Sequence, residues 1–496
     1  MRALGLAIVL VGSTVGAAAA QRSVMPSVPQ SLTLSDAVDL ALRYNRSYRQ
    51  VANDRPAAAW GVRNAYSQLF FPSMSASLSF GYSGAGSQTF LDQEFTQESS
   101  TIGSDYGLNL NWRLSGTTLT QPGLARAQMR ATEAQIDGAE VNLRANVQQQ
   151  YLAALQAEAQ VRIVEIQVTR NEEFLRLAQA RFQVGQATML DVRQAEVAKG
   201  QADVRLLQAR QGVIVEKLRL YQQIGLPAPE DPTTLVLPDT FPVTEPEWQL
   251  GTLLRAADMD NPDVAVLEAR AAAARSSERS AKAQWLPTLS LSAGWSGFTR
   301  EYSNPDFLVA SARGQLDASR TECEYTNSAW LNPGQTPLPC SGLALSPEDE
   351  QRIIAGNNVF PFSFTTQPFS ARVSLSLPIF TQFGREADIS QASQLADDAM
   401  EEVENQRLWV RTNVSQAYYG LIAAYQAIGI QEANRVAAQE QLRLATERYR
   451  VGSGTFFELL DAQVAEQTAE ADYINAIYAY HRTIATLEAA VGRPLR

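Results

Sequence analysis

The stretch Arg-Phe-Gln-Val-Gly-Gln-Ala-Thr at residues 181–188 returns as Arg-Tyr-Arg-Val-Gly-Ser-Gly-Thr at residues 448–455. Both stretches belong to a longer repeat, because residues 146–227 align with residues 413–494 at a constant offset of 267, without insertion or deletion. Long helices favour such exact spacing, since an inserted residue would shift their packing register. We therefore predict one helix-rich unit used twice, and we expect function to lie in its geometry rather than in one catalytic cluster.

The front of each half repeats as well, since residues 34–45 match residues 250–261. Between the halves, residues 227–248 are rich in Pro, Asp and Glu, which is typical of a linker. We therefore divide the mature chain into a first repeat at 21–226, a Pro-rich linker at 227–248 and a second repeat at 249–496.

Each copy of the quoted stretch predicts the tip of a long helical hairpin. A glycine in the left-handed conformation ends a helix, and a threonine caps the next one. The predicted tips are residues 184–188 and 451–455. The segments before them, about 125–183 and 385–450, have apolar residues at coiled-coil spacing. At 1.5 Å per residue, each such helix would span roughly 90 Å.

Four other segments change the period of their apolar residues from 3.6 to 2, which predicts β-strands. They lie at about 73–84, 106–115, 287–297 and 370–380, and each has one apolar face and one face of mainly Ser, Asn and Gly. Strands of about 9–11 residues with such faces fit an outer-membrane barrel, in which lipid covers the apolar face and water the polar one. A soluble sandwich edge or hairpin would show the same alternation and stays open as an alternative.

Four strands are too few to close a barrel, for which about eight is the smallest size. We therefore predict a homotrimer, in which three copies of four strands give a 12-stranded barrel in contact with outer-membrane lipid. The predicted fold is mixed α and membrane β. Each chain has an internal two-fold repeat and ends each half in a long helical hairpin.

The N-terminus predicts a secretory signal peptide at residues 1–20. Arg2 precedes an apolar run at residues 4–11, and alanines at 17–20 supply a small-residue cleavage site. The apolar run falls short of the roughly 20 residues that a transmembrane helix needs. The sequence therefore indicates export across the inner membrane.

Charge and residue usage exclude several functions. The net charge of −11 argues against nucleic acid as a partner, because phosphate binding needs a basic face. The single histidine, His481, is expected to be ordinary helix surface, which leaves no catalytic triad. One His and two Cys cannot supply a usual zinc site. We therefore expect no enzymatic activity, no cofactor and no metal, and a secreted hydrolase is disfavoured.

Two loops are predicted, one at 85–105 and an unusually long one at 298–368. Ser346 followed by Pro347 predicts a helix start inside the long loop. Cys323 and Cys340 lie in the same loop, and an oxidising compartment favours a local disulfide between them. Two unpaired buried thiols are the alternative.

The signal peptide, the duplicated helix–strand–strand–hairpin unit and the paired tip motifs together resemble the TolC family of outer-membrane efflux proteins. The resemblance covers nearly the whole mature chain. It implies a homotrimer whose shared 12-stranded outer-membrane β-barrel is continued by a long periplasmic α-helical coiled-coil barrel, which forms a tunnel. It also implies that the tips dock with a periplasmic adaptor, the membrane fusion protein, which connects to an inner-membrane pump. The tip residues concerned are Val184, Gly185, Thr188, Val451, Gly452 and Thr455.

The same resemblance assigns a gate to the tips. Glu458 and Asp461 match the family's aperture acids, with a solvated acidic helix face as the alternative. Asp191 and Tyr449 match a pair that hydrogen-bonds between neighbouring hairpins in the closed state. The chain departs from the family at Gly454, where a family member has an arginine link, and Arg193 is the nearby candidate for its replacement.

The leading hypothesis is a passive exit duct for efflux or type I secretion, driven by the partner pump. A cell-surface coiled-coil scaffold or adhesin without channel activity is the competing hypothesis. The four alternating strands discriminate between them, because a scaffold has no need of strands with one apolar and one Ser/Asn face.

Overall fold

The computed structural model describes residues 30–90, 93–97, 99–329, 334 and 336–495, and gives no side-chain description for 88–97. The predicted signal peptide at 1–20 lies outside these residues. Within them, the chain forms two compact units. The first comprises residues 30–55, 132–268 and 401–495, and the second comprises residues 56–131 and 269–400.

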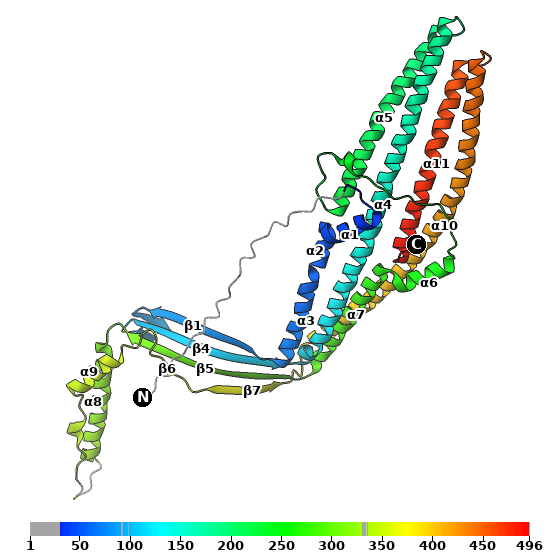
Figure 1. Ribbon diagram of the computed structural model, residues 1–496. Helices are drawn as coiled ribbons and strands as arrows, with labels where there is room; N and C mark the ends of the chain where they lie inside the picture. The colour runs from blue at the N-terminus through cyan, green and yellow to red at the C-terminus, as the bar shows by residue number, and fades with distance from the viewer. Residues whose placement is uncertain (1–29, 91–92, 98, 330–333, 335, 496) are drawn as a thin grey trace. The chain divides into compact units, whose positions relative to one another are not determined.

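The second unit holds an antiparallel sheet (Figure 1). Its long strands are β1 (Ser73–Ser83), β4 (Thr101–Leu114), β5 (Thr288–Tyr302) and β7 (Ser370–Ser376). The order is β1-β4-β5-β7, and the short β6 (Thr365–Thr366) also pairs with β5. Within the described part of the chain, β1 pairs only with β4 and β7 only with β5, so both edge strands have a free side.

The register separates the side chains into two faces. Leu108 pairs with Ala76 on one side and with Trp295 on the other, so these three share the apolar face. Asn109 pairs with Ser75 and Gly294 on the opposite, polar face. The largest exposed residues of the apolar face are Met74, Leu78, Phe80, Tyr82, Leu108, Trp295, Val373 and Leu375.

The strand ends differ from the prediction where pairing overrides local pattern. β4 begins at Thr101 rather than at 106 and β5 continues to Tyr302 rather than to 297, because these two residues pair with each other. β7 stops at Ser376 rather than at 380. Pro378 follows it, and proline has no N–H to give to a ladder.

Both predicted loops contain regular structure. Residues 85–105 include a second hairpin, β2 (Gly86–Phe90) with β3 (Gln93–Gln97), and the start of β4. Residues 298–368 include the helices α8 (Asp306–Ala329), η3 (Cys340–Gly342) and α9 (Pro347–Gly356). Reading these two stretches as loops was therefore wrong for most of their length.

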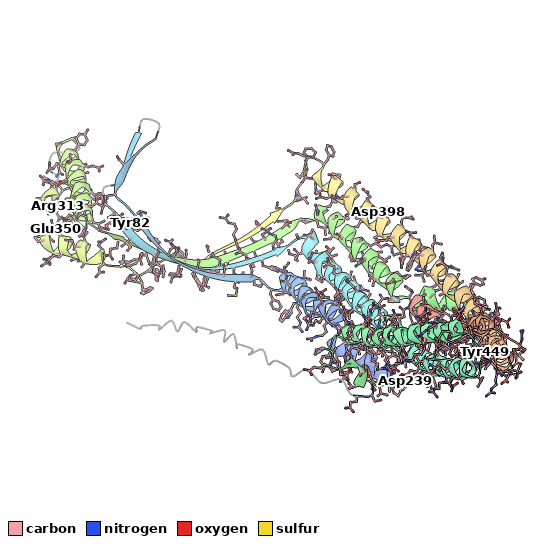
Figure 2. The ribbon with its side chains drawn as sticks, turned by 90° about the horizontal axis from the view of Figure 1, so that it is seen from above. Tyr82, Asp239, Arg313, Glu350, Asp398 and Tyr449 are labelled. Atoms are coloured by element: carbon pink, nitrogen blue, oxygen red, sulfur yellow. A yellow bond between two sulfur atoms is a disulfide. The ribbon has the colours of Figure 1, made fainter. Side chains whose placement is uncertain are left out.

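Contacts distant in sequence hold the α8–α9 segment together. Cys323 and Cys340 form a disulfide that ties α8 to η3. Arg313 Nε donates to Glu350 Oε1 at 2.9 Å, which ties α8 to α9, and Figure 2 shows the two side chains meeting. Ser346 caps α9 by accepting from Asp349 N, as its sequence predicted.

Two further helices each precede a strand of the sheet in the sequence, the first before β1 and the second before β5. They are α3 (Asp54–Phe70) and α7 (Pro262–Lys282), followed by η2 (Ala283–Trp285). Trp112 donates from its indole nitrogen to Leu69 O at 3.2 Å. Arg385 lies 3.9 Å from the Trp285 ring. Both contacts fix the turns between helix and strand.

The first unit holds most of two long helical hairpins, and the first helix of each hairpin begins in the second unit (Figure 1). One pairs α4 (Gly116–Gln183) with α5 (Met189–Ile224), and the other pairs α10 (Gly384–Arg450) with α11 (Phe456–Val491). Three apolar clusters form its core, one for each hairpin and one that both hairpins share near their tips.

The short helices α1 (Leu34–Tyr44), α2 (Arg46–Ala52) and α6 (Leu250–Asp260) close the far ends of the hairpins. Asn45 Nδ2 donates to Gln223 O at 2.7 Å, and Asn261 Nδ2 donates to Ala490 O at 2.8 Å. The two acceptors are 490 − 223 = 267 residues apart, which is the offset found in the sequence. Gly225 ends α5 beside Asn45 with φ +87°, where a Cβ atom would lie 2.4 Å from Tyr44 O.

The segment 227–248 is packed along both hairpins rather than looped freely. Lys217 is 3% exposed and donates from Nζ to Leu235 O at 2.6 Å, and it pairs with Glu158 at 2.8 Å. Tyr151 Oη donates to Asp239 at 2.8 Å. Tyr480 Oη donates to Thr244 O at 2.6 Å, so the segment is fixed at both ends.

His481 is 2% exposed, which corrects the expectation that it is helix surface. Its ring lies 5.6 Å from Phe241 of the linker and 5.1 Å from Tyr480. The linker therefore covers a position that the pattern of α11 alone would leave at the surface. Among the described residues, no helix is both long and apolar enough to cross a membrane.

Candidate functional site at the hairpin tips

The first tip is a tight turn between α4 and α5. Gly185 has φ +75°, and its N–H donates to Phe182 O. Val184 beside it is 68% exposed. Thr188 begins α5 with a reciprocal cap, because its hydroxyl accepts from Asp191 N while the Asp191 carboxylate accepts from Thr188 N. The turn therefore displays an apolar side chain on a rigid backbone.

The second tip repeats this geometry between α10 and α11. Gly452 has φ +86° and its N–H donates to Tyr449 O. Val451 is 75% exposed. Thr455 caps α11 by accepting from Glu458 N. The predicted tip residues of each hairpin thus lie together at the end of that hairpin.

An arginine joins the two tips within one chain. Arg181 lies on α4 and is 9% exposed. Its guanidinium carbon lies 4.5 Å from the centroid of the Tyr449 ring, and its Nη1 donates to Tyr449 O. Its Nη2 donates to Gln186 O at 3.0 Å. One side chain therefore ties the turn of the first hairpin to the last residues of α10.

Apolar packing supports this contact. Phe174 and Ala178 of α4 belong to the same buried cluster as Phe456 and Leu459 of α11. The ring of Tyr449 lies 5.5 Å from that of Phe456 in an edge-to-face arrangement. Together with the arginine, this cluster makes the two tips one packed body.

Asp191 and Tyr449, the predicted gate pair, do not hydrogen-bond to each other within one chain. Asp191 is engaged by the Thr188 cap. Tyr449 is 2% exposed, and its hydroxyl has no hydrogen-bond partner among the described residues. Burial raises the pKa of the Tyr449 phenol, the negative charge of Asp191 raises this pKa further, and Arg181 opposes the rise. The phenol is therefore neutral at physiological pH and keeps a proton to donate.

The predicted aperture acids lie exposed on the first turns of α11. Glu458 Oε2 lies 3.4 Å from Arg448 Nη2, while Asp461 follows on the same helix face. Arg193, the candidate for the arginine absent at Gly454, pairs instead with Glu196 on its own helix at 2.7 Å. The arginine beside Gly454 is Arg448.

Arg181 and Arg448 are functional candidates that the sequence interpretation left without a role. Both belong to the repeated tip motif, 267 residues apart, and this equivalence was the available signal. Their structures differ, because Arg181 is buried over Tyr449 whereas the Arg448 side chain is 59% exposed.

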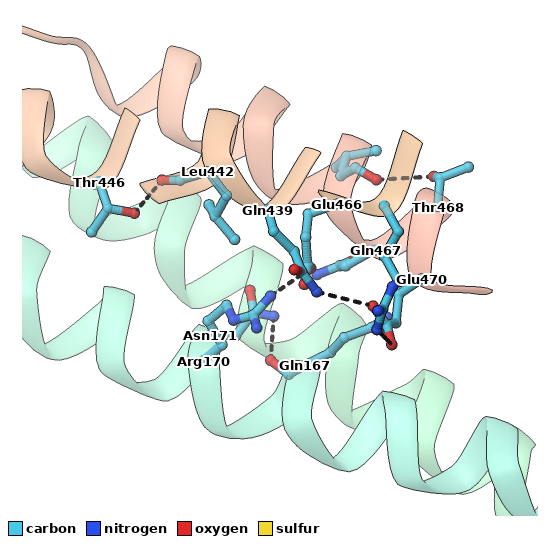
Figure 3. A network of polar contacts seen from close by, with 12 residues as sticks. Gln167, Arg170, Asn171, Gln439, Leu442, Thr446, Glu466, Gln467, Thr468 and Glu470 are labelled. Carbon is cyan, nitrogen blue, oxygen red and sulfur yellow. Dashed lines mark hydrogen bonds and ion pairs between the residues drawn. The ribbon is translucent and has the colours of Figure 1, made fainter. Parts of the chain in front are cut away.

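Farther from the tips, a polar belt joins the hairpins (Figure 3). Arg170 of α4 pairs with Glu466 of α11 at 2.5 Å, and Glu466 is 5% exposed. Arg205 of α5 donates to Gln467 Oε1 at 3.1 Å. Buried charge pairs are strongly sensitive to loss of one partner, so these contacts fix the register of one hairpin against the other.

Residues 37–226 and 341–493 match the family model described as outer membrane efflux protein. The chain belongs to this family. Its location is the outer membrane.

Related proteins agree with this assignment. A curated relative, the pyoverdine export outer membrane protein OpmQ of Pseudomonas putida, is 28% identical over 203 residues. That match spans 38% of this chain and 42% of the relative, so the chain is matched to less than half of that protein's length.

Solved structures show the same fold along most of the chain. A membrane protein from Pseudomonas aeruginosa superposes with a TM-score of 0.69 at 21% identity, covering 93% of this chain and 90% of that one. The open-state MtrE outer membrane channel of Neisseria gonorrhoeae gives a TM-score of 0.66 at 19% identity, covering 93% and 89%. The Campylobacter jejuni CmeC outer membrane channel gives 0.68 at 16% identity, covering 92% and 85%.

Proposed function

We propose that the chain is one protomer of a passive export channel, the outer-membrane exit duct of a tripartite efflux or type I secretion system. Membership of the outer membrane efflux protein family supports this function. The single observation that carries it is the sheet, whose apolar face exposes large hydrophobic side chains such as Met74, Trp295 and Leu375 while the opposite face is Ser- and Asn-rich. Such faces suit lipid on one side and a wet lumen on the other.

The channel is a homotrimer with a 12-stranded barrel. Support comes from the two free edges, since β1 and β7 each have a row of backbone groups without a partner in the described residues. In a bilayer such groups must be satisfied by another strand, because lipid offers no hydrogen bonds. Pairing β1 of one copy with β7 of the next closes a barrel of three copies of four strands.

Each protomer is a duplicated unit, with repeats at 21–226 and 249–496 around the linker at 227–248. The matched Asn45 and Asn261 contacts support the duplication, because each asparagine ends one short helix and binds the last turn of the corresponding hairpin. A helix end whose carbonyls are bonded in this way is fixed in direction.

The tips dock a periplasmic adaptor, which connects the duct to an inner-membrane pump that supplies the energy. The exposed Val184 and Val451 on rigid turns support this role, since no internal packing requires them. Gly185→Trp and Gly452→Trp are expected to abolish export while folding and membrane insertion stay normal. Wild-type export by both variants would contradict docking at the tips.

The tunnel is gated at the same end. Glu458 and Asp461 of three protomers form an acidic ring, and Tyr449 donates to Asp191 of a neighbouring hairpin in the closed state. The Tyr449 hydroxyl is buried and has no acceptor among the described residues, and the charge of Asp191 already acts on its pKa, which supports a small movement of the hairpins as the step that brings the two groups into hydrogen-bond distance. In this proposal the chain is a passive duct without an enzymatic role, which its membership of the outer membrane efflux protein family supports.

Two measurements test the proposal. Purified protein in detergent is expected to migrate as a heat-sensitive trimer, and its reconstitution into a planar bilayer should give single-channel conductance.

Met74→Asp, on the apolar face of β1, should prevent insertion, whereas Ser75→Asp on the polar face should not. A monomer without conductance would contradict the channel and favour a surface scaffold.

A further inference from the structure

The chain that returns from α9 crosses the apolar face of the sheet. We call residues 357–364 the aromatic flap. The Phe360 ring lies 6.1 Å from Phe80 of β1, and the Phe364 ring lies 4.8 Å from Tyr106 of β4. The flap thus passes over β5, β4 and β1 before the chain joins β5 again as β6.

Hydrogen bonds fix the root of the flap to the end of β5. The Asn357 side chain accepts from Tyr302 N at 2.9 Å and donates to Tyr302 O at 2.8 Å. Glu301 accepts from the backbone N–H of Val359 at 3.2 Å and of Phe360 at 3.0 Å. The flap is therefore anchored to β5 by side-chain and backbone hydrogen bonds.

Polar residues of the otherwise apolar face lie beneath it. Ser104 and Thr299 pair across β4 and β5 and are 2% and 5% exposed. Their hydroxyls lie 2.9 Å apart, and Ser104 Oγ donates to Pro361 O. Hydroxyl groups without a partner are costly in hydrocarbon. The flap supplies an acceptor and covers the hydroxyls.

We propose that the aromatic flap is a lipid-binding surface of the outer leaflet, an inference that rests on the proposed function. We identify lipid as its ligand because the flap lies on the apolar face of the sheet, the face that contacts lipid in the proposed barrel. Ser104 and Tyr106 are three and five residues from Thr101, about 10 and 17 Å along the strand from its outer end. Outer-membrane barrels carry girdles of aromatic residues at both membrane interfaces.

Phe362 is the contact residue. It is 66% exposed, and it follows Pro361, whose carbonyl is bonded to the sheet. Phe360 and Phe364 pack on Phe80 and Tyr106, whereas Phe362, whose ring lies 6.3 Å from that of Phe364, keeps most of its surface available to acyl chains. The α8–α9 segment is consequently attached on the lipid side of the wall and not on the Ser/Asn side that lines the lumen.

Site-directed spin labelling in reconstituted phospholipid vesicles tests this inference. Phe362→Cys is compared with Leu375→Cys on the apolar face of β7, 71% exposed, and Tyr325→Cys on α8, 64% exposed. The native cysteines are joined in a disulfide and do not take the label without reductant. Collision rates with oxygen, which partitions into lipid, and with a water-soluble nickel chelate are measured for each label.

The ratio of oxygen to nickel collisions at 362 should be several-fold above that at 325 and close to that at 375. A water-like ratio at 362 with a lipid-like ratio at 375 would refute lipid binding by the flap and leave the proposed channel intact. A label at 362 shielded from both reagents would overturn it too, because protein would then cover the ring. Water-like ratios at both 362 and 375 would contradict the membrane barrel itself.

Discussion

The guanidinium of Arg181 stacks 4.5 Å from the ring of Tyr449 and donates to its carbonyl oxygen, although 268 residues separate the two in sequence. Arg181 lies on the first hairpin and Tyr449 on the second, so the contact joins the tips of one protomer. A planar guanidinium can stack on an aromatic ring and donate several hydrogen bonds at once, which lysine cannot do. Within one chain, the two tips are therefore joined by Arg181 of α4.

Arg181→Ala should loosen the tips and raise the resting conductance in planar bilayers. The variant loses a cation–π contact of about 0.5–2 kcal/mol and two charged hydrogen bonds of about 1.5–3 kcal/mol each. Arg181→Lys should be intermediate, because it keeps the charge and loses the planar geometry. Arg176→Ala is the control, since that side chain is 75% exposed and its ion pair with Glu172 is long, at 3.9 Å. Equal conductance of Arg181→Ala and the control would refute the role.

Glu458→Gln combined with Asp461→Asn should remove block by multivalent cations and weaken cation selectivity. In the proposed trimer, three copies would bring six carboxylates into a narrow ring, whose attraction for cations is screened beyond about 8–10 Å at physiological salt. Bilayer recordings at several salt concentrations measure the effect. Glu440→Gln, an acid paired with Arg443 on α10, is the matched control. Block that persists in the double variant would make the two acids ordinary helix surface.

Gly225→Ala should lower the unfolding temperature more than Gly185→Ala. Both glycines have positive φ, which costs an L-residue about 1–2 kcal/mol. At Gly225 the added Cβ would also lie 2.4 Å from Tyr44 O, whereas at Gly185 nothing lies within 4 Å. Thermal unfolding followed by circular dichroism measures the difference. Similar losses in the two variants would show that α1 can move away from the end of α5.

Lys217→Met should free the linker and destabilise the first hairpin. Removing one partner of a buried ion pair costs up to about 3–5 kcal/mol, and Glu158 would lose its partner at 2.8 Å. Proteolysis within 227–248 should become faster. Lys199→Met, which breaks an exposed pair with Asp203, should leave proteolysis of this segment nearly unchanged, because exposed ion pairs contribute little to stability. Equal proteolysis of the two variants would argue against Lys217 as the linker anchor.

Alkaline pH should weaken the tips through Tyr449. Burial raises the pKa of its phenol above the usual value of about 10. The folded state therefore keeps this proton at a pH where the unfolded state has lost it, so the stabilisation is present below pH 10 and is lost as pH rises through the folded pKa. Ultraviolet titration of phenolate should show one late-ionising tyrosine fewer in Tyr449→Phe than in the wild type. Identical late titrations of wild type and Tyr449→Phe would contradict the assignment.

Local sequence determined the helical hairpins and their tips. The tip at 184–188 lies between the end of α4 at Gln183 and the start of α5 at Met189. Glycine and threonine act within their own turn, by allowing positive φ and by capping the next helix, so no distant contact is needed to place them. The alternation along β1 is local in the same sense, because successive side chains of a strand point to opposite faces.

Only the tertiary structure decided the contacts between segments far apart in the chain. The reach of Arg181 to Tyr449, the burial of His481 under Phe241, and the extension of β4 by the pairing of Thr101 with Tyr302 all depend on such contacts. So do the α8–α9 segment, held by a disulfide and an ion pair, and the flap that covers Ser104. Periodicity reports which face of an element is apolar, but not which partner covers it, because that depends on how the whole chain packs.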